Sequence, residues 1–344
     1  MAAGTSFDLK SFIASVVEGN DQSFEETQKA FGCLMDGEAS ATQIGALLTA
    51  LRMKGETVPE ITGAAEAMRD RMVPISAPEG AIDVCGTGGD AKGTLNISST
   101  VAFVATAAGA TVAKHGNRAA SSKSGAGDVL EALGINCAAE FDLVEKALRD
   151  NGTCFLFAQR HHPAMRHVGP SRAELGMRTI FNFLGPLSNP CRIKKQLMGV
   201  FDRNWVEPLA QVLKQLGHET AWVAHGAEGL DELSICGESL VTELKNGQLS
   251  SFSVVPEDAG LERAPLDAIR GGDGAHNARA MRALLAGEDT GAYRTSVLLN
   301  ASAALIVAGI ASDLKDGVAR ATEAIDSGEA LKRLDGLVAI SNGN

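Results

Sequence analysis

The residues best suited to chemistry follow a short, largely apolar run in the first third of the chain. Residues 82–85 form that run, and Gly86, Gly88, Gly89 and Asp90 come directly after it. This order predicts a buried strand that ends in a glycine turn, where the backbone can approach a ligand closely.

Hydroxyl and amide side chains precede the next apolar stretch. Asn96, Ser98 and Ser99 stand just before residues 101–108, whose composition is helical, and we interpret all three as N-cap residues. A glycine turn followed by a helix N-terminus brings unpaired N–H groups and the positive end of the helix dipole together. The stretch indicates an anion site, although glycines and serines in this order also serve as a plain turn and cap. It matches neither a Walker A loop nor a complete dinucleotide fingerprint.

A second loop adds positive charge. Residues 111–113 read as a strand, and the loop at 114–126 carries Lys114, Arg118 and Lys123 with no acid before residue 126. Lysine charge, serine hydroxyls and backbone amides are the donors that phosphate groups accept from. We therefore expect this loop to face phosphates.

Five motifs occur in an order and at separations that resemble the anthranilate phosphoribosyltransferase family. The resemblance extends over nearly the whole chain, because residues 41–57 also look like the N-terminal helical segment of that family. The motifs are GTGGD at 86–90, NISS at 96–99, KHGNR with SSKSG at 114–125, FNFLGPLSNP at 181–190 and LDE at 230–232.

The resemblance implies transfer of the phosphoribosyl group of phosphoribosyl pyrophosphate (PRPP) to the amino group of anthranilate, with release of pyrophosphate, in tryptophan biosynthesis. Charge develops on the sugar and on the leaving group, so the task of the protein is electrostatic and positional. No covalent nucleophile is needed. The neutral arylamine can attack without a general base, so we assign no catalytic role to His115, His161 or His162.

The resemblance also implies a set of site residues. Mg²⁺, two ions per subunit, is expected at Ser98, Asp231 and Glu232, although spacing alone favours surface charge for the two acids. Anthranilate is expected at Gly86, Asn117 and Arg172. PRPP is expected at Gly86, Gly89, Asp90, Thr94, Asn96, Ile97, Ser98, Ser99, Lys114, His115, Gly116, Asn117, Arg118, Ala119, Ala120, Ser121, Ser122 and Ala126.

The chain departs from the commonest family pattern at two places. Ala126 and Gly127 stand where a serine and a small residue often occur, which weakens a side-chain hydrogen bond from position 126 to PRPP. Ser99 replaces a frequent threonine but keeps the hydroxyl. Neither change alters the assignment.

The overall charge argues for small anionic substrates. The 344 residues carry a formal net charge of −11, which disfavours nucleic acid as a partner. Cations nevertheless concentrate in residues 114–123 and 160–195, where the only carboxylate is Glu174. A solvated basic face is the plainer interpretation of such clusters.

Cysteine usage and the N-terminal sequence favour a cytoplasmic location. No secretory leader is visible, and the most apolar helix, 297–311, is too short to span a bilayer, so no membrane partner is expected. Six cysteines without metal-ligand spacing are typical of buried free thiols, at positions 33, 85, 137, 154, 191 and 236.

Helical periodicity dominates residues 6–72, and from residue 82 strands alternate with helices. The predicted fold is α/β: an all-helical domain (1–76 plus about 163–182) and a larger domain (77–162 plus 183–344) with a mainly parallel central sheet, similar to nucleoside phosphorylases and phosphoribosyltransferases. Three helices without chemistry are expected at the end. By resemblance, the substrate cleft lies between the domains, and a homodimer forms through the helical domain.

Two other functions are compatible with parts of the sequence. A pyrimidine nucleoside phosphorylase shares the architecture and also handles a ribosyl anomeric centre, but it has no need of the acidic pair for a metal. A non-catalytic relative that binds nucleic acid should show a basic surface and damaged motifs. This chain is acidic and its motifs are intact.

Overall fold

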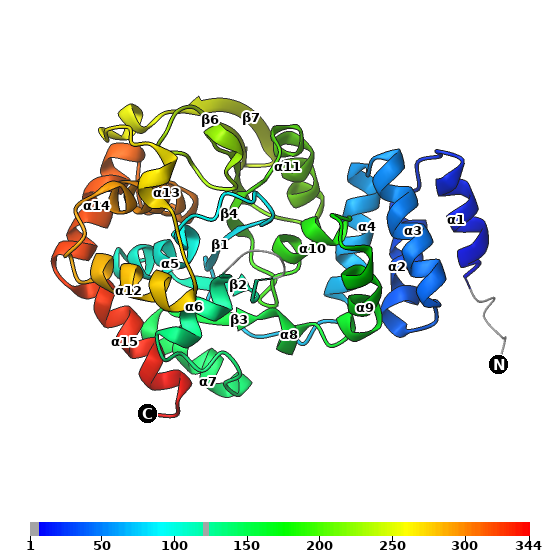
Figure 1. The fold of residues 1–344 in the computed structure, drawn as a ribbon, viewed down its shortest axis with the longest axis horizontal. Helices are drawn as coiled ribbons and strands as arrows, with labels where there is room; N and C mark the ends of the chain where they lie inside the picture. The colour runs from blue at the N-terminus through cyan, green and yellow to red at the C-terminus, as the bar shows by residue number, and fades with distance from the viewer. Residues whose placement is uncertain (1–6, 120–123) are drawn as a thin grey trace. The chain divides into compact units, whose positions relative to one another are not determined.

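The computed structural model describes residues 7–119 and 124–344, which divide into two units (Figure 1). The helical unit holds the described residues up to Val73 and continues at Gln159–Pro190. The α/β unit holds those of Pro74–Ala158 and Cys191–Asn344. The predicted fold class, a helical domain joined to a larger α/β domain, is confirmed.

Amphipathic helices build the helical unit. Ser23 and Glu26 form a capping box at the start of α2, and apolar side chains such as Leu34, Leu47 and Ile61 are fully buried between the helices. The helices are α1 (Leu9–Val17), α2 (Phe24–Asp36), α3 (Ala41–Lys54), α4 (Val58–Arg69), α8 (Ala158–His161), α9 (Met165–Leu175) and α10 (Phe181–Leu187).

One seven-stranded sheet forms the centre of the α/β unit, in the order β3-β2-β1-β4-β5-β6-β7. The first five strands in this order pair in parallel, whereas β5-β6 and β6-β7 pair antiparallel. The strands are β1 (Ile82–Gly86), β2 (Val112–Gly116), β3 (Thr153–Phe157), β4 (Lys195–Gly199), β5 (Thr220–His225), β6 (Ser239–Lys245) and β7 (Gln248–Val254).

The β6-β7 hairpin was not predicted. Its turn, Asn246-Gly247, has φ of 53° and 74°, which is the left-handed geometry that joins two-residue hairpins. The side chains of β7 are mostly polar and exposed, so this edge strand has no apolar run. The Asn-Gly pair was the available signal.

Helices cover the sheet and end the chain. Four α-helices follow Gly272, one more than the three predicted. The α-helices are α5 (Ile97–Ala107), α6 (Ala126–Ala132), α7 (Phe141–Lys146), α11 (Val206–Gln215), α12 (Gly274–Leu285), α13 (Ala292–Ala308), α14 (Leu314–Asp326) and α15 (Glu329–Ser341). Shorter turns are η1 (Ala147–Asn151), η2 (Arg203–Trp205), η3 (Ala227–Gly229), η4 (Pro256–Ala259) and η5 (Leu266–Ile269).

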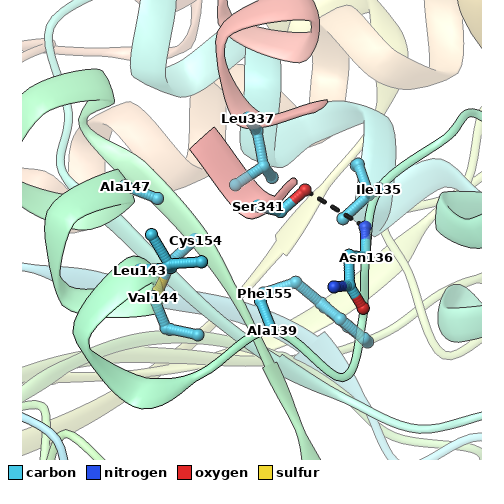
Figure 2. Close-up of a pocket in the computed structure, with 10 residues that line it drawn as sticks. All are labelled: Ile135, Asn136, Ala139, Leu143, Val144, Ala147, Cys154, Phe155, Leu337 and Ser341. Carbon is cyan, nitrogen blue, oxygen red and sulfur yellow. Dashed lines mark hydrogen bonds between the residues drawn. The ribbon is translucent and has the colours of Figure 1, made fainter. Parts of the chain in front are cut away.

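A small pocket lies between β3, α7 and α15, where apolar side chains meet (Figure 2). The backbone N–H of Asn136 donates to the Ser341 hydroxyl over 3.1 Å at its rim. None of the ten residues that line the pocket is charged. A pocket of this chemistry does not suit phosphates, so the anion site must lie elsewhere.

The structure bears on two expectations from the sequence, which concern the state of the cysteines and the absence of a membrane-spanning helix. All six cysteines are free, but only Cys85, Cys137 and Cys154 are buried, whereas the other three are partly exposed. Burial raises the pKa of Cys85 and Cys154 well above the ordinary thiol value, so both stay protonated. Across residues 7–119 and 124–344, no helix combines the length and the apolar character needed to cross a bilayer.

A buried ion pair in the helical unit allows a stability test. Glu60 is fully buried and accepts hydrogen bonds from Lys54 Nζ (3.0 Å) and from the N–H groups of Gln22 (3.0 Å) and Thr57 (2.8 Å). Glu60→Ala leaves the 6% exposed Lys54 without this partner and should lower the free energy of unfolding by about 3–5 kcal/mol in urea denaturation.

Asp21→Ala provides the control, because Asp21 contacts the same Lys54 Nζ at 2.7 Å but is 71% exposed. An exposed partner should cost about 1 kcal/mol or less. Equal losses of unfolding free energy in the two variants would show that the burial of Glu60 does not determine how much its ion pair with Lys54 stabilises the protein.

Candidate active site

The glycine turn after β1 lies beside two acidic side chains. Gly88 and Gly89 have φ of 66° and 78°, a region that favours glycine, and the turn is anchored where Thr87 N–H donates to Gly199 O over 3.0 Å. A Cβ added at Gly86 would overlap the Asp231 carboxylate. The absence of a side chain at Gly86 therefore lets the acidic loop approach the turn.

The helix N-terminus predicted beside this turn is present, with one correction. Helix α5 begins at Ile97, so Ser98 and Ser99 lie in its first turn and are not N-caps. Asn96 is the N-cap residue, but its side chain makes no capping bond; its Oδ1 accepts from Asn277 Nδ2 over 2.8 Å. No Asn96 cap therefore occupies the first-turn N–H groups, although Ile97 N–H donates to Leu95 O over 2.9 Å and Ser98 N–H donates to Glu232.

Asp231 and Glu232 each accept a hydrogen bond from this anion site. Asp231 Oδ2 accepts from Gly88 N–H over 2.7 Å, and Glu232 Oε1 accepts from Ser98 N–H over 3.1 Å. Both residues are partly accessible to solvent. The loop of the acidic pair, the glycine turn and the α5 N-terminus therefore form a single site.

Negative charge accumulates at this site. Burial raises the pKa of Asp231, and the neighbouring Asp90 carboxylate raises it further. Burial also raises the pKa of Glu232, followed by the charge of Asp231, while the Lys114 ammonium acts in the opposite direction. Asp231 is thus repelled by Asp90, and Glu232 by Asp231, so a bound cation would relieve the repulsion.

Lys114 lies on a strand and not in the loop predicted for it. Strand β2 runs through Gly116, and Lys114 is only 4% exposed. Its Nζ donates to Val84 O over 2.7 Å and to Ser98 Oγ over 3.4 Å. The strand therefore delivers the ammonium group to the first turn of α5.

The oxygen donors at the site fit Mg²⁺. Ser98 Oγ, Asp231 and Glu232 offer a hydroxyl and two carboxylates, which are hard ligands. Among the described residues, no three His, Cys, Asp or Glu side chains gather closely enough to hold an ion by themselves. This agrees with the habit of Mg²⁺, which binds through one or two carboxylates and completes its shell with water and substrate phosphates.

The loop after β2 is tied to α6. Asp128 accepts from the N–H groups of Ala119 (2.9 Å) and Gly125 (2.8 Å), and Gly127 N–H donates to Asn117 O over 3.1 Å. Ala126 opens α6 with a methyl group, so it offers no side-chain donor. Of the predicted PRPP residues, Ala120, Ser121 and Ser122 lie outside the described residues, as does the nearby Lys123.

Arg118, also in this loop, makes contacts within the α/β unit. Its guanidinium pairs with Glu131 and lies 5.5 Å from the centroid of the Phe157 ring. Part of its charge is therefore neutralised within the protein.

The segment at residues 270–277 is hydrogen-bonded to the end of the glycine loop, a contact that the sequence did not predict. Thr94 forms an isolated antiparallel bridge with Arg270, and Gly271 N–H donates to Gly93 O over 2.8 Å. The Asn277 amide joins this segment to Asn96. The signal was the GGDG run at 271–274, whose Asp273 caps α12.

In the helical unit, Arg172 has an open guanidinium. The guanidinium carbon lies 4.9 Å from the centroid of the Phe181 ring, and within residues 7–119 and 124–344 the side chain has no hydrogen bond or ion pair. Burial lowers the pKa of Arg172, but the ordinary guanidinium value is so high that the group stays charged near pH 7. Its planar donors are available to a carboxylate.

The three histidines considered as proton carriers are buried. His115 lies on β2, and its backbone N–H donates to Asp83 Oδ1 over 3.1 Å. Burial lowers the pKa of His161, and it lowers that of His162 to about 4. His161 and His162 are therefore neutral near pH 7, which suits a role in packing.

The crowded carboxylates predict a pH-dependent stability. Below the ordinary carboxyl pKa of about 4 the acids are protonated in the folded and unfolded states and contribute nothing. Above it the unfolded state ionises first, so the free energy of unfolding falls as pH rises. In metal-free buffer, Asp231→Asn with Glu232→Gln should raise the melting temperature by roughly 3 °C at pH 8 and leave it unchanged at pH 4.

Thermal denaturation with a chelator, repeated with Mg²⁺, measures this effect. Added Mg²⁺ should reduce the difference between the two proteins at pH 8. A double variant that melts below the unsubstituted protein at pH 8 would show that the carboxylates stabilise the empty site.

Comparison with known proteins places the whole chain in one family. Residues 78–331 match the model described as "Glycosyl transferase family, a/b domain", and residues 10–72 match "Glycosyl transferase family, helical bundle domain". The anthranilate phosphoribosyltransferase of Rhodopseudomonas palustris is 55% identical over 334 residues, which is 97% of this chain and 98% of that protein. That of Brucella canis is 54% identical with the same coverage.

Solved structures agree with the sequence comparison. Anthranilate phosphoribosyltransferase from Thermus thermophilus superimposes with a TM-score of 0.92 at 43% identity, over 96% of this chain and 99% of that one. The Saccharomyces cerevisiae enzyme in complex with PRPP and Mg has a TM-score of 0.90 at 27% identity, over 98% of each chain. The resemblance found in the motifs is confirmed, and this chain belongs to the anthranilate phosphoribosyltransferase family.

Proposed function

We propose that this protein transfers the phosphoribosyl group of PRPP to the amino group of anthranilate and releases pyrophosphate, a step of tryptophan biosynthesis. One observation carries the proposal: Asp231 and Glu232 are hydrogen-bonded to the glycine turn and to the first turn of α5. Carboxylates next to an anion site would repel an anionic substrate unless a cation binds between them. A magnesium pyrophosphate ester supplies both the cation and the anion.

PRPP occupies the anion site in this proposal. The turn at Gly86–Asp90 and the first turn of α5 supply N–H groups, and the loop after β2 supplies further donors. Lys114 acts through its charge next to Ser98, 3.4 Å from that hydroxyl. The fold positions these groups before the substrate arrives. Gly88 N–H and Ser98 N–H already donate to Asp231 and Glu232, so these two would have to exchange a carboxylate acceptor for a phosphate oxygen.

Ser98, Asp231 and Glu232 are the proposed metal ligands, with two Mg²⁺ ions per subunit. When bound, Mg²⁺ supplies positive charge that offsets the charge developing on pyrophosphate. The carboxylates of this chain orient that charge because their own positions are set by Gly88 and Ser98.

Arg172, with Gly86 and Asn117, is the proposed anthranilate site. Anthranilate carries a carboxylate beside its amine, and the open guanidinium of Arg172 can hold a carboxylate with two parallel hydrogen bonds. The neutral arylamine needs no general base, in keeping with the low pKa of the buried His161 and His162. Binding and orientation of the two substrates then account for the catalysis.

We also propose a homodimer formed through the helical unit. Val17 and Met53 support it, because these apolar side chains of the helical unit are 67% and 83% exposed. Sedimentation of the purified protein tests this assembly.

The decisive experiment follows the loss of anthranilate fluorescence when PRPP and Mg²⁺ are added. Asp231→Asn with Glu232→Gln should lower kcat/KM by about 100-fold or more, equivalent to about 2.7 kcal/mol of transition-state stabilisation. Raised Mg²⁺ should restore part of the loss. Near-normal activity of this variant at limiting Mg²⁺ would mean that the acids are not metal ligands, and phosphorolysis of uridine or thymidine without PRPP would favour a nucleoside phosphorylase instead.

Substitution of Arg172 tests the acceptor site. Arg172→Lys and Arg172→Ala should both raise the KM for anthranilate at least about 10-fold, since a charge-assisted hydrogen bond contributes about 1.5–3 kcal/mol and lysine lacks the planar fork. PRPP affinity, measured with Mg²⁺ in the absence of acceptor, should change little. A lower melting temperature with an unchanged KM for anthranilate would assign Arg172 to packing on Phe181.

A further inference from the structure

Three polar side chains lie in a row on a buried face of α13. Tyr293, Ser296 and Asn300 are 2%, 1% and 1% exposed. Their spacing of three and seven residues places them on one face of the helix. Buried polar groups destabilise a core unless they are hydrogen-bonded, so their partners indicate what the row contributes.

Asn300 binds the residue that follows the acidic pair. Its Oδ1 accepts from Leu233 N–H over 2.9 Å, and its Nδ2 donates to Leu233 O over 2.9 Å. The side-chain amide thus copies the paired bonds between two antiparallel strands. A third bond, from Nδ2 to Ser296 O over 2.9 Å, fixes the amide to its own helix. The backbone next to Glu232 is therefore clamped to α13.

Tyr293 binds the other half of the site. Its hydroxyl lies 2.6 Å from Thr100 Oγ1 and 3.4 Å from Asn96 O, at the first turn of α5. Burial raises the pKa of Tyr293, so the hydroxyl keeps its proton. Helix α13 therefore contacts both the acidic loop and α5, whose first-turn N–H groups face that loop.

We propose that Tyr293 and Asn300 are positioning residues that use α13 as a rigid spacer between the metal carboxylates and the N-terminus of α5. Two helical turns, about 10 Å, separate the two side chains. The contact that this spacer preserves is the one between Glu232 and Ser98 N–H. The inference rests on the proposed function, because it assigns these residues to the Mg²⁺ and PRPP site.

Ser296 marks the difference between positioning and mere burial. It lies in the same row, yet within residues 7–119 and 124–344 its hydroxyl has no hydrogen-bond partner. Ser296→Ala therefore changes the same helix face without changing a contact to the site. Asn151, a buried residue whose amide donates to Arg333 O over 2.8 Å, provides a second control, because its contacts lie at η1 and α15.

The test is calorimetric titration of PRPP into the full chain at a series of Mg²⁺ concentrations, together with melting temperatures. Asn300→Leu and Asn300→Ala should raise the Mg²⁺ concentration for half-maximal PRPP binding about 10-fold. This change corresponds to losing one charge-assisted hydrogen bond, the one between Ser98 N–H and Glu232. Tyr293→Phe removes one hydroxyl and keeps the ring, so it should fold and show a smaller shift in the same direction. Ser296→Ala and Asn151→Ala should leave the Mg²⁺ dependence unchanged, although Asn151→Ala melts at a lower temperature.

The outcomes separate this inference from the function it rests on. If the unsubstituted protein binds PRPP with Mg²⁺ and the Asn300 and Tyr293 variants show the Mg²⁺ dependence of Asn151→Ala, then α13 only packs and the inference is wrong. If the Asn300 variants fail to fold, Tyr293→Phe alone decides by the same criterion. Absence of Mg²⁺-dependent PRPP binding in the unsubstituted protein overturns the proposed function and this inference together.

Discussion

The site depends on holding carboxylates where an anion binds. An incoming phosphate could accept hydrogen bonds from Gly88 N–H and Ser98 N–H. These groups already donate to Asp231 and Glu232. Parallel strands β1, β2, β4 and β5 end at one edge of the sheet, which is why the glycine turn, the cationic loop and the acidic loop meet there. Gly86 and Gly199 lack a side chain where one would overlap the acidic loop. Local negative charge, bare backbone and sheet topology are thus parts of one arrangement.

The charge of the whole chain is a poor guide to this site. A net charge of −11 disfavours nucleic acid as a partner but does not describe this site, where Lys114 lies buried beside Ser98 while Arg118 is partly neutralised by Glu131. The buried Lys114 ammonium acts on Glu232 at short range, where few water molecules screen it. The electrostatics of the proposed PRPP site therefore follow from a few neighbouring groups and not from the average surface.

Several elements could be predicted because one signal dominated each of them. The apolar run at residues 82–85 became β1, and the stretch at 101–108 became most of α5. Lys114 was misassigned to a loop because a charged residue normally ends a buried strand, whereas its ammonium here bonds Val84 O. Strand β7 was missed for the opposite reason, since an exposed edge needs no apolar run. The family resemblance, and not periodicity, supplied the acidic pair. Asn300 could not be assigned because its partner, Leu233, is 67 positions away.

The division of the chain into units has a consequence for its synthesis. The helical unit is completed only when Gln159–Pro190 has left the ribosome, yet its first helices are made before any strand of the sheet. Strand β1 pairs with β2 early, but its other neighbour, β4, begins at Lys195. Helices α1–α4 can pack on one another early, whereas the contacts of α2, α3 and α4 with α9 and α10 form only after more than half of the polypeptide has been translated. Until then, the surface that α9 and α10 later cover is exposed to solvent and can bind chaperones or other chains.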